Sequence, residues 1–178
     1  MTKKDDFILK ALNVVSWVIF IGLCVEAGAL IFNFIFTLFK PIASHGIYKG
    51  LNLSELYINH FAHYVSLMSF VLSLAILKAY LFYFVVQIFT KLNLGNPFNT
   101  EIAKLIEKIG FEAFVISIIS IVAHQYTKGL MQDGFDVDSI ESYWNDSSAF
   151  MMMAAILFII SQIFKKGIEL QNENDLTV

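Results

Sequence analysis

The hydrophobic and polar positions of this chain are segregated into long segments and do not alternate residue by residue. Apolar runs occupy residues 7–39 and 57–89, and two shorter runs lie within about residues 111–126 and 149–164. Apolar runs of more than about 18 residues are typical of membrane-spanning helices. The pattern therefore predicts an all-α, polytopic membrane four-helix bundle that forms a single integral membrane domain over residues 1–178.

The four predicted spans differ in length. As helices, the first two runs would each be about 50 Å long, whereas the hydrocarbon layer of a bilayer is about 30 Å thick. These two helices must tilt or extend beyond the membrane. The last two runs are short for spans, and each needs flanking residues, such as 108–110 and 145–148, to reach both interfaces.

The distribution of lysines predicts the orientation of the spans, because cytoplasmic loops of membrane proteins carry an excess of basic residues. Lysines are concentrated on the side of the bundle that holds both termini, whereas the opposite loops, residues 41–56 and 128–147 with the adjoining Lys40, carry fewer. Both termini are therefore expected inside. The lysines of the inner side are Lys3, Lys4, Lys10, Lys91, Lys104, Lys108, Lys165 and Lys166, and those of the outer side are Lys40, Lys49 and Lys128.

The loop between the second and third spans contains a helical pattern of its own. Asn96 suits an N-cap and Pro97 a first helical residue. Apolar residues then recur at helical spacing from residue 98 to residue 109, with charged residues on the opposite face. We expect a short amphipathic helix at the inner interface with a bend at Gly110. The alternative is a straight cytoplasmic extension of the third span.

Two charged residues fall inside the predicted membrane segments, namely Glu26 in the first span and Lys78 in the second. A charge at that depth usually faces the interior of the bundle and finds a partner. In an antiparallel pair of helices these two residues lie at similar depths, so they are candidates for an intramembrane polar pair. The pair could form part of an ion path, or it could be purely structural.

All four histidines fall on the predicted outer side. His60 and His63 are three residues apart and therefore lie on one helix face, and His124 is at the outer end of the third span. Imidazole binds zinc, copper, nickel and iron and titrates near neutral pH. The set His60, His63 and His124 is thus a candidate site for a divalent metal. The alternative is that these rings anchor the helix ends at the interface.

Composition narrows the classes of function. The chain is 57% hydrophobic and only 15% charged, contains no arginine, and has a net charge of −3. A direct nucleic-acid partner is therefore not expected. Neither a nucleophile–base set nor a metal-hydrolase motif is visible, so we do not expect an enzyme. The lipid bilayer is the expected environment, and a second copy of the chain is a candidate partner.

Two segments together resemble a known family. Lys91-Leu92-Asn93-Leu94-Gly95-Asn96-Pro97-Phe98-Asn99, followed by Ile109-Gly110, resembles the inner-loop signature of the family called domain of unknown function 2975. The end of the chain, Ile163-Phe164-Lys165-Lys166-Gly167-Ile168-Glu169-Leu170-Gln171-Asn172-Glu173-Asn174-Asp175-Leu176-Thr177-Val178, is similar to the closing motif of that family. The motif residues are Gly95, Asn96, Pro97 and Phe98 in the inner loop, and Gly167, Leu170, Gln171, Glu173, Asp175, Leu176 and Thr177 in the tail.

The resemblance implies a four-span protein of the bacterial inner membrane whose gene commonly neighbours one for a small helix-turn-helix regulator. It therefore implies a membrane sensor or regulator that works with this cytoplasmic transcription factor. The acidic tail, residues 167–178, could meet such a basic partner, or it could simply be solvated. The second hypothesis is a small transporter or ion-translocating protein that uses Glu26 and Lys78.

Overall fold

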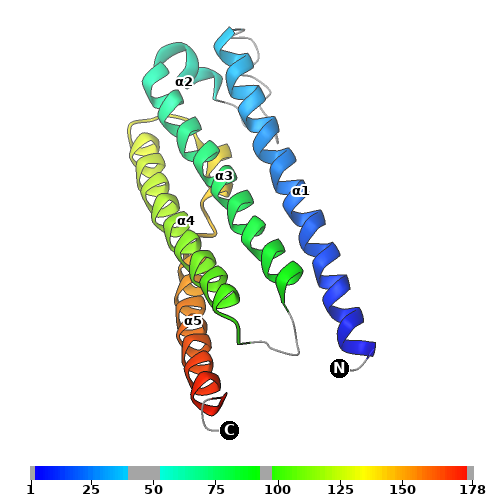
Figure 1. Cartoon of the computed structure of the whole chain (residues 1–178). Coiled ribbons are helices and arrows are strands. Elements are labelled where there is room, and N and C mark those ends of the chain that lie inside the picture. The colour runs from blue at the N-terminus through cyan, green and yellow to red at the C-terminus, as the bar shows by residue number, and fades with distance from the viewer. Residues whose placement is uncertain (1–2, 40–52, 93–97, 176–178) are drawn as a thin grey trace.

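The computed structural model describes residues 3–39, 53–92 and 98–175, and every regular element within these ranges is helical (Figure 1). The prediction of an all-α fold is confirmed. The elements are α1 (Lys3–Phe39), α2 (Ser54–Asn59), α3 (Phe61–Lys91), α4 (Thr100–Gln132), the 3-10 helix η3 (Asp138–Tyr143) and α5 (Ser147–Asp175).

The four long helices are neighbours in chain order, since α1 packs against α3, α3 against α4, and α4 most extensively against α5. Figure 1 shows that α1 begins and α5 ends at one end of the bundle, which we call the terminal end. We call the opposite end, where α2 lies, the α2 end. Among the described residues, contact between α1 and α5 is at most marginal, so the bundle is open between these two helices.

Three helical stretches are long and apolar enough to cross a membrane, namely Phe7–Phe39, Phe61–Lys91 and Asp138–Asn174. Most large apolar side chains of α1 are exposed on the surface of the bundle, for example Phe32 and Val25. An apolar surface of this extent is incompatible with water and suits lipid. The protein is therefore a membrane protein.

The predicted amphipathic helix is the first part of α4, which continues without interruption through Gly110. Of the two alternatives, the straight extension is thus the correct one. The helix also starts later than expected, because Phe98 and Asn99 are not helical. The N-cap is Asn99, whose side-chain oxygen accepts a hydrogen bond from the backbone N–H of Glu101 at 2.7 Å. The predicted cap, Asn96, and Pro97 lie outside the described residues.

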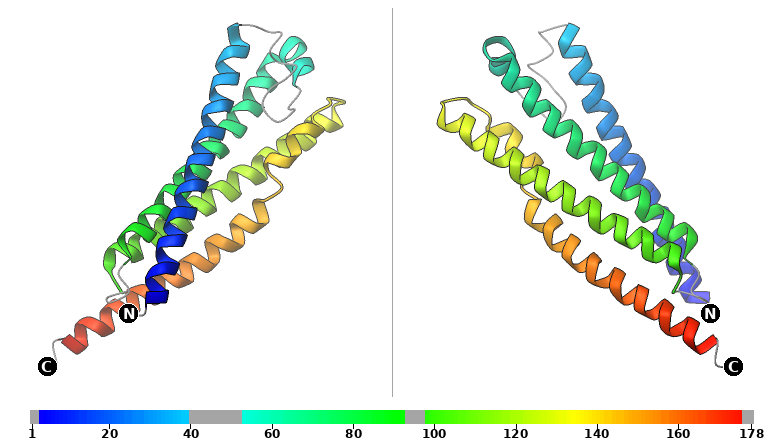
Figure 2. Two further views of the ribbon diagram at one scale, coloured as in Figure 1. Left: turned by 90° about the vertical axis from the view of Figure 1, so that its right-hand side faces the viewer. Right: turned by 60° about the vertical axis from the view of Figure 1, so that its left-hand side comes forward.

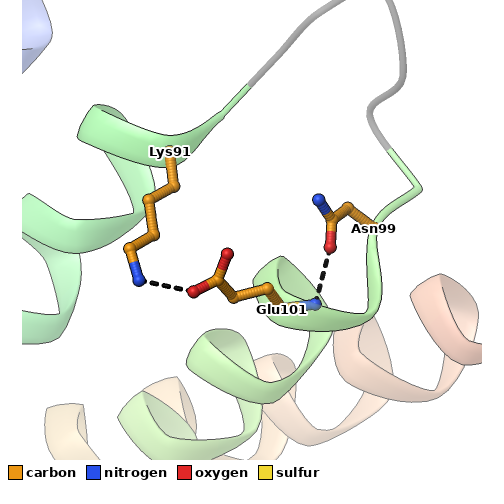
Figure 3. Close-up of polar contacts among 3 residues, drawn as sticks. All are labelled: Lys91, Asn99 and Glu101. Atoms are coloured by element: carbon orange, nitrogen blue, oxygen red, sulfur yellow. Dashed lines mark hydrogen bonds and ion pairs between the residues drawn. The ribbon is translucent and has the colours of Figure 1, made fainter.

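An ion pair between Lys91 and Glu101 links the end of α3 to the start of α4 (Figure 3). The buried core lies mainly between α3 and α4 and includes Tyr64, Leu67 and Ile116. Gly110 lets α4 approach α5 closely, since a Cβ atom at this position would lie 3.3 Å from the Cβ of Leu157. These contacts hold α3, α4 and α5 together.

Candidate functional site

The segment between α4 and α5 returns deep into the bundle. After α4 ends at Gln132, the chain reverses direction at Gly134, whose φ of 92° lies in the left-handed region that glycine tolerates. The chain then runs through η3 towards the middle of the molecule, as the yellow-to-orange segment of Figure 2 shows. At the start of α5, the backbone carbonyl of Ser147 accepts a hydrogen bond at 2.8 Å from the hydroxyl of Ser117, near the midpoint of α4.

This return leaves a cavity of about 370 Å³ between α1, α3, η3 and the residue that precedes α5, which we call the chamber. Its charged side chains are Glu26 from α1, Lys78 from α3 and Asp146 from the residue that precedes α5. Apolar residues of α1 and α3 and polar residues of η3 complete the wall. The full lining is Leu23, Glu26, Leu30, Leu74, Ala75, Lys78, Ser142, Tyr143 and Asp146.

The ammonium group of Lys78 has two neighbours from the last part of the chain. Its Nζ atom lies 3.8 Å from Oδ2 of Asp146 and 5.5 Å from the ring centroid of Phe150. The side chain of Lys78 is 26% exposed and that of Asp146 is 65% exposed. Lys78 therefore joins α3 to the start of α5 through a charge pair and a cation–π contact.

The candidate polar pair is only part of this site. The structure brings Glu26 and Lys78 to one chamber, in agreement with their similar predicted depths. The sequence placed Asp146 in an outer loop and among the residues that extend the fourth run, but it did not pair Asp146 with Lys78. The shortness of the fourth apolar run was the one signal that this loop supplies residues at membrane depth.

The three histidines proposed as metal ligands do not converge. The rings of His60 and His63 are neighbours, with centroids 5.9 Å apart, but His63 Nδ1 lies 2.7 Å from the hydroxyl of Tyr126. His124 lines a different hollow, of about 250 Å³, beside η3. Successive residues of a helix are about 100° apart, so Tyr126 and His124 point in nearly opposite directions from α4.

The structure therefore does not bring these three residues together in one metal site. Within the ranges that the structure describes, no group of three or more histidine, cysteine, aspartate or glutamate side chains could hold a metal ion. His60 instead packs edge-on against Phe135, with ring centroids 4.7 Å apart. His45 lies outside the described residues.

The two motif segments meet at the terminal end of the bundle. The ring of Phe98 packs against Phe164, with centroids 5.5 Å apart, and it covers Gly167 so closely that a Cβ atom there would lie 2.5 Å from a ring carbon. Near them, the ammonium of Lys165 lies 3.1 Å from the carboxylate of Glu107. These contacts fasten α5 to the start of α4.

Beyond Gly167, α5 stays helical to Asp175 and extends past the ends of α3 and α4 in both views of Figure 2. Leu170 and Glu173 are exposed and Gln171 is half-buried. Gly95, Asn96, Pro97, Leu176 and Thr177 lie outside the described residues. The tail residues that the structure does describe therefore form an exposed helical end that carries acidic side chains.

Comparison with family models gives a match over residues 52–178 to the family described as protein of unknown function (DUF2975). The chain belongs to this family. Comparison with the curated proteins and with the solved structures gives no match. Within this DUF2975 protein, Lys78, Asp146 and both motif segments lie inside the matched region, whereas Glu26 precedes it.

Proposed function

We propose that this DUF2975 protein is a non-enzymatic membrane sensor or regulator in which α5 connects the chamber to a cytoplasmic tail. The observation that carries the proposal is the course of α5. The helix begins beside Lys78 and Asp146 and continues without a break to Asp175. Any change in the charge or occupancy of the chamber acts on the first turn of a rigid element whose other end is exposed.

The proposal includes an orientation in a bacterial inner membrane. We propose four crossings, with α4 as the fourth, because α4 lies between two apolar helices and is 33 residues long. The terminal end would face the cytoplasm, since lysines are concentrated there, including Lys91, Lys104 and Lys165. The α2 end would then face outward.

The partner that the family resemblance suggests is a small helix-turn-helix transcription factor. The exposed end of α5 carries Glu169 and Glu173, and negative charge of this kind favours association with a basic surface such as that of a DNA-binding domain. Binding to the membrane protein would keep the factor away from DNA until the state of the chamber changes.

The test is copurification of the full-length protein in mild detergent with a small helix-turn-helix regulator of the kind whose genes commonly neighbour those of this family. We expect binding that is lost in a Glu169→Gln/Glu173→Gln variant and altered several-fold in Lys78→Met, which leaves the tail intact. Glu55→Gln, at an exposed position of α2, is the matched control and should bind like the wild type. Absence of binding by the wild-type protein would rule out this function.

The chamber itself favours a second candidate function, the movement of an ion or small solute. Charged side chains around a mid-bundle cavity are typical of transport sites. This function predicts that Glu26→Gln abolishes the flux of the transported ion or solute into proteoliposomes, whereas removal of residues 168–178 has no effect on that flux. A regulator predicts the opposite for binding of the transcription factor: removal of residues 168–178 abolishes binding, and Glu26→Gln preserves it.

A further inference from the structure

The polar sequence of residues 133–146 predicts a loop at the outer membrane surface, but the structure places the end of this segment near the middle of the bundle. Ser117 is about 15 residues, or about 22 Å, from the end of α4 at Gln132, and Ser147 is hydrogen-bonded to it. Lys78, the partner of Asp146, lies about 17 residues into α3 from the α2 end. The segment therefore spans roughly half the length of α3 and α4 before α5 begins.

Polar side chains accompany this segment along its whole course. Those that are exposed are Asp133, Asp136, Asp138, Ser139, Glu141, Ser142, Asn145 and Asp146. Two hollows adjoin η3, one of about 250 Å³ that includes Glu141 and His124, and the chamber of about 370 Å³ that includes Ser142. Only a part of the segment is apolar and buried, chiefly Val137, Ile140 and Trp144.

Lipid cannot solvate such a surface. Irregular backbone at membrane depth is tolerated where it is buried in protein or lines a water-filled cavity. Here the polar side chains are exposed rather than buried, and Asp146, the deepest of them, is 65% exposed. Since α1 and α5 leave the bundle open next to the chamber, water has room beside the segment.

We propose that residues 133–146 line a water-filled vestibule that leads from the α2 end to Lys78 in the middle of the bundle. Its lining is acidic, with Asp138, Glu141 and Asp146 on the return segment, and cations should therefore enter it faster than anions. The proposal concerns only the access of water and ions to the chamber. It therefore holds equally for a regulator and for a transporter.

Cysteine accessibility tests this proposal. The native thiol is removed first by Cys24→Ala, since Cys24 is exposed on α1. Ser142→Cys and Asn145→Cys then probe the vestibule. Ile76→Cys, two residues from Lys78 and 49% exposed, is the matched control on the apolar surface. Asp133→Cys marks the α2 end. Charged, membrane-impermeant methanethiosulfonates are applied separately to each side of the membrane, in intact cells and in inverted vesicles.

We expect Ser142→Cys and Asn145→Cys to react from the same side as Asp133→Cys, at rates within about tenfold of it and faster with the cationic reagent. Ile76→Cys should react at least about 100-fold more slowly because lipid covers it. Labelling after denaturation confirms that each thiol is present, and a monodisperse elution profile confirms that each variant is folded.

If Asp133→Cys reacts while both vestibule positions stay as unreactive as Ile76→Cys, the proposal is overturned. Lipid or a second copy of the chain then covers the segment. The side from which Asp133→Cys reacts depends only on orientation, so an inverted topology would contradict the orientation in the proposed function without affecting the vestibule. Binding to the transcription factor is measured independently and can fail without changing any labelling rate.

Discussion

At the scale of single residues, Lys78 is the cation that lines the chamber, where it pairs with Asp146, the residue before α5, and shares the lining with Glu26 of α1. Replacing it by methionine preserves the bulk of the stem but leaves Asp146 without its ammonium partner. Since Lys78 is 26% exposed but Asp146 is 65% exposed, solvent screens the pair, and we expect Lys78→Met to lower the free energy of unfolding by at most about 1 kcal/mol. Denaturation in detergent micelles, followed by circular dichroism, measures this loss.

A double-mutant cycle separates the charge pair from other effects of the substitution. Adding Asp146→Asn to Lys78→Met should restore part of the lost stability, because the unpaired carboxylate is then gone. The matched control is Lys91→Met, which breaks the exposed pair with Glu101 and should cost at most about 0.5 kcal/mol. Equal losses in Lys78→Met and Lys91→Met, with no recovery in the double variant, would show that the pair with Asp146 contributes nothing.

At the scale of elements, the contact between α4 and α5 depends on two glycines that have little space around them. Gly110 faces Leu157 at the middle of the contact, and Gly167 lies under the ring of Phe98 at its end. The sequence did reveal Phe98 and Gly167, but as members of two separate motifs. The structure explains the pair, because the ring occupies the space that a side chain at residue 167 would need.

Substitution of Gly110 tests how closely these two helices must approach. Gly110→Leu should separate α4 from α5 and lower the free energy of unfolding by about 1–3 kcal/mol, the usual cost of overpacking. Gly22 is a matched control, since it also lies within a long helix but has no atom within 4 Å of an added Cβ. Gly22→Ala should be neutral or stabilising by up to about 1 kcal/mol. Similar destabilisation in both variants would contradict the close-packing explanation.

The helices could be predicted from the sequence, but the return of the chain before α5 could not. Apolar runs and helical periodicity locate α1, α3 and α5 and the amphipathic start of α4 because burial against lipid or protein imposes these patterns. The stretch from residue 133 to residue 146 is polar, and hydropathy assigns such a stretch to the aqueous side. Its position depends on tertiary contacts, such as those of Ser117 and Lys78, which no local pattern encodes.

At the scale of the whole molecule, the long helices are antiparallel, so helices that cross the membrane must end on alternating sides of it. Whether α4 crosses determines on which side each connection between the helices lies. The first turns of α4 carry Lys104, Glu107 and Lys108, yet this helix packs against α3 on one side and, over its first half, against α5 on the other. The proposed fourth crossing rests on this placement of α4 between two apolar helices, since α4 itself is not among the three helical stretches that are long and apolar enough to span a membrane.

Reporter fusions at three points test this arrangement. We expect green fluorescent protein to fluoresce, and alkaline phosphatase to be inactive, when either is fused after Leu92 or after Asp175. The opposite result is expected after Gln132, because these positions lie at the terminal end and the α2 end respectively. These expectations follow from the proposed orientation, in which the lysine-rich terminal end faces the cytoplasm. If fusions after Leu92 and Gln132 report the same side, α4 does not cross, and the vestibule would then have no membrane depth to bridge.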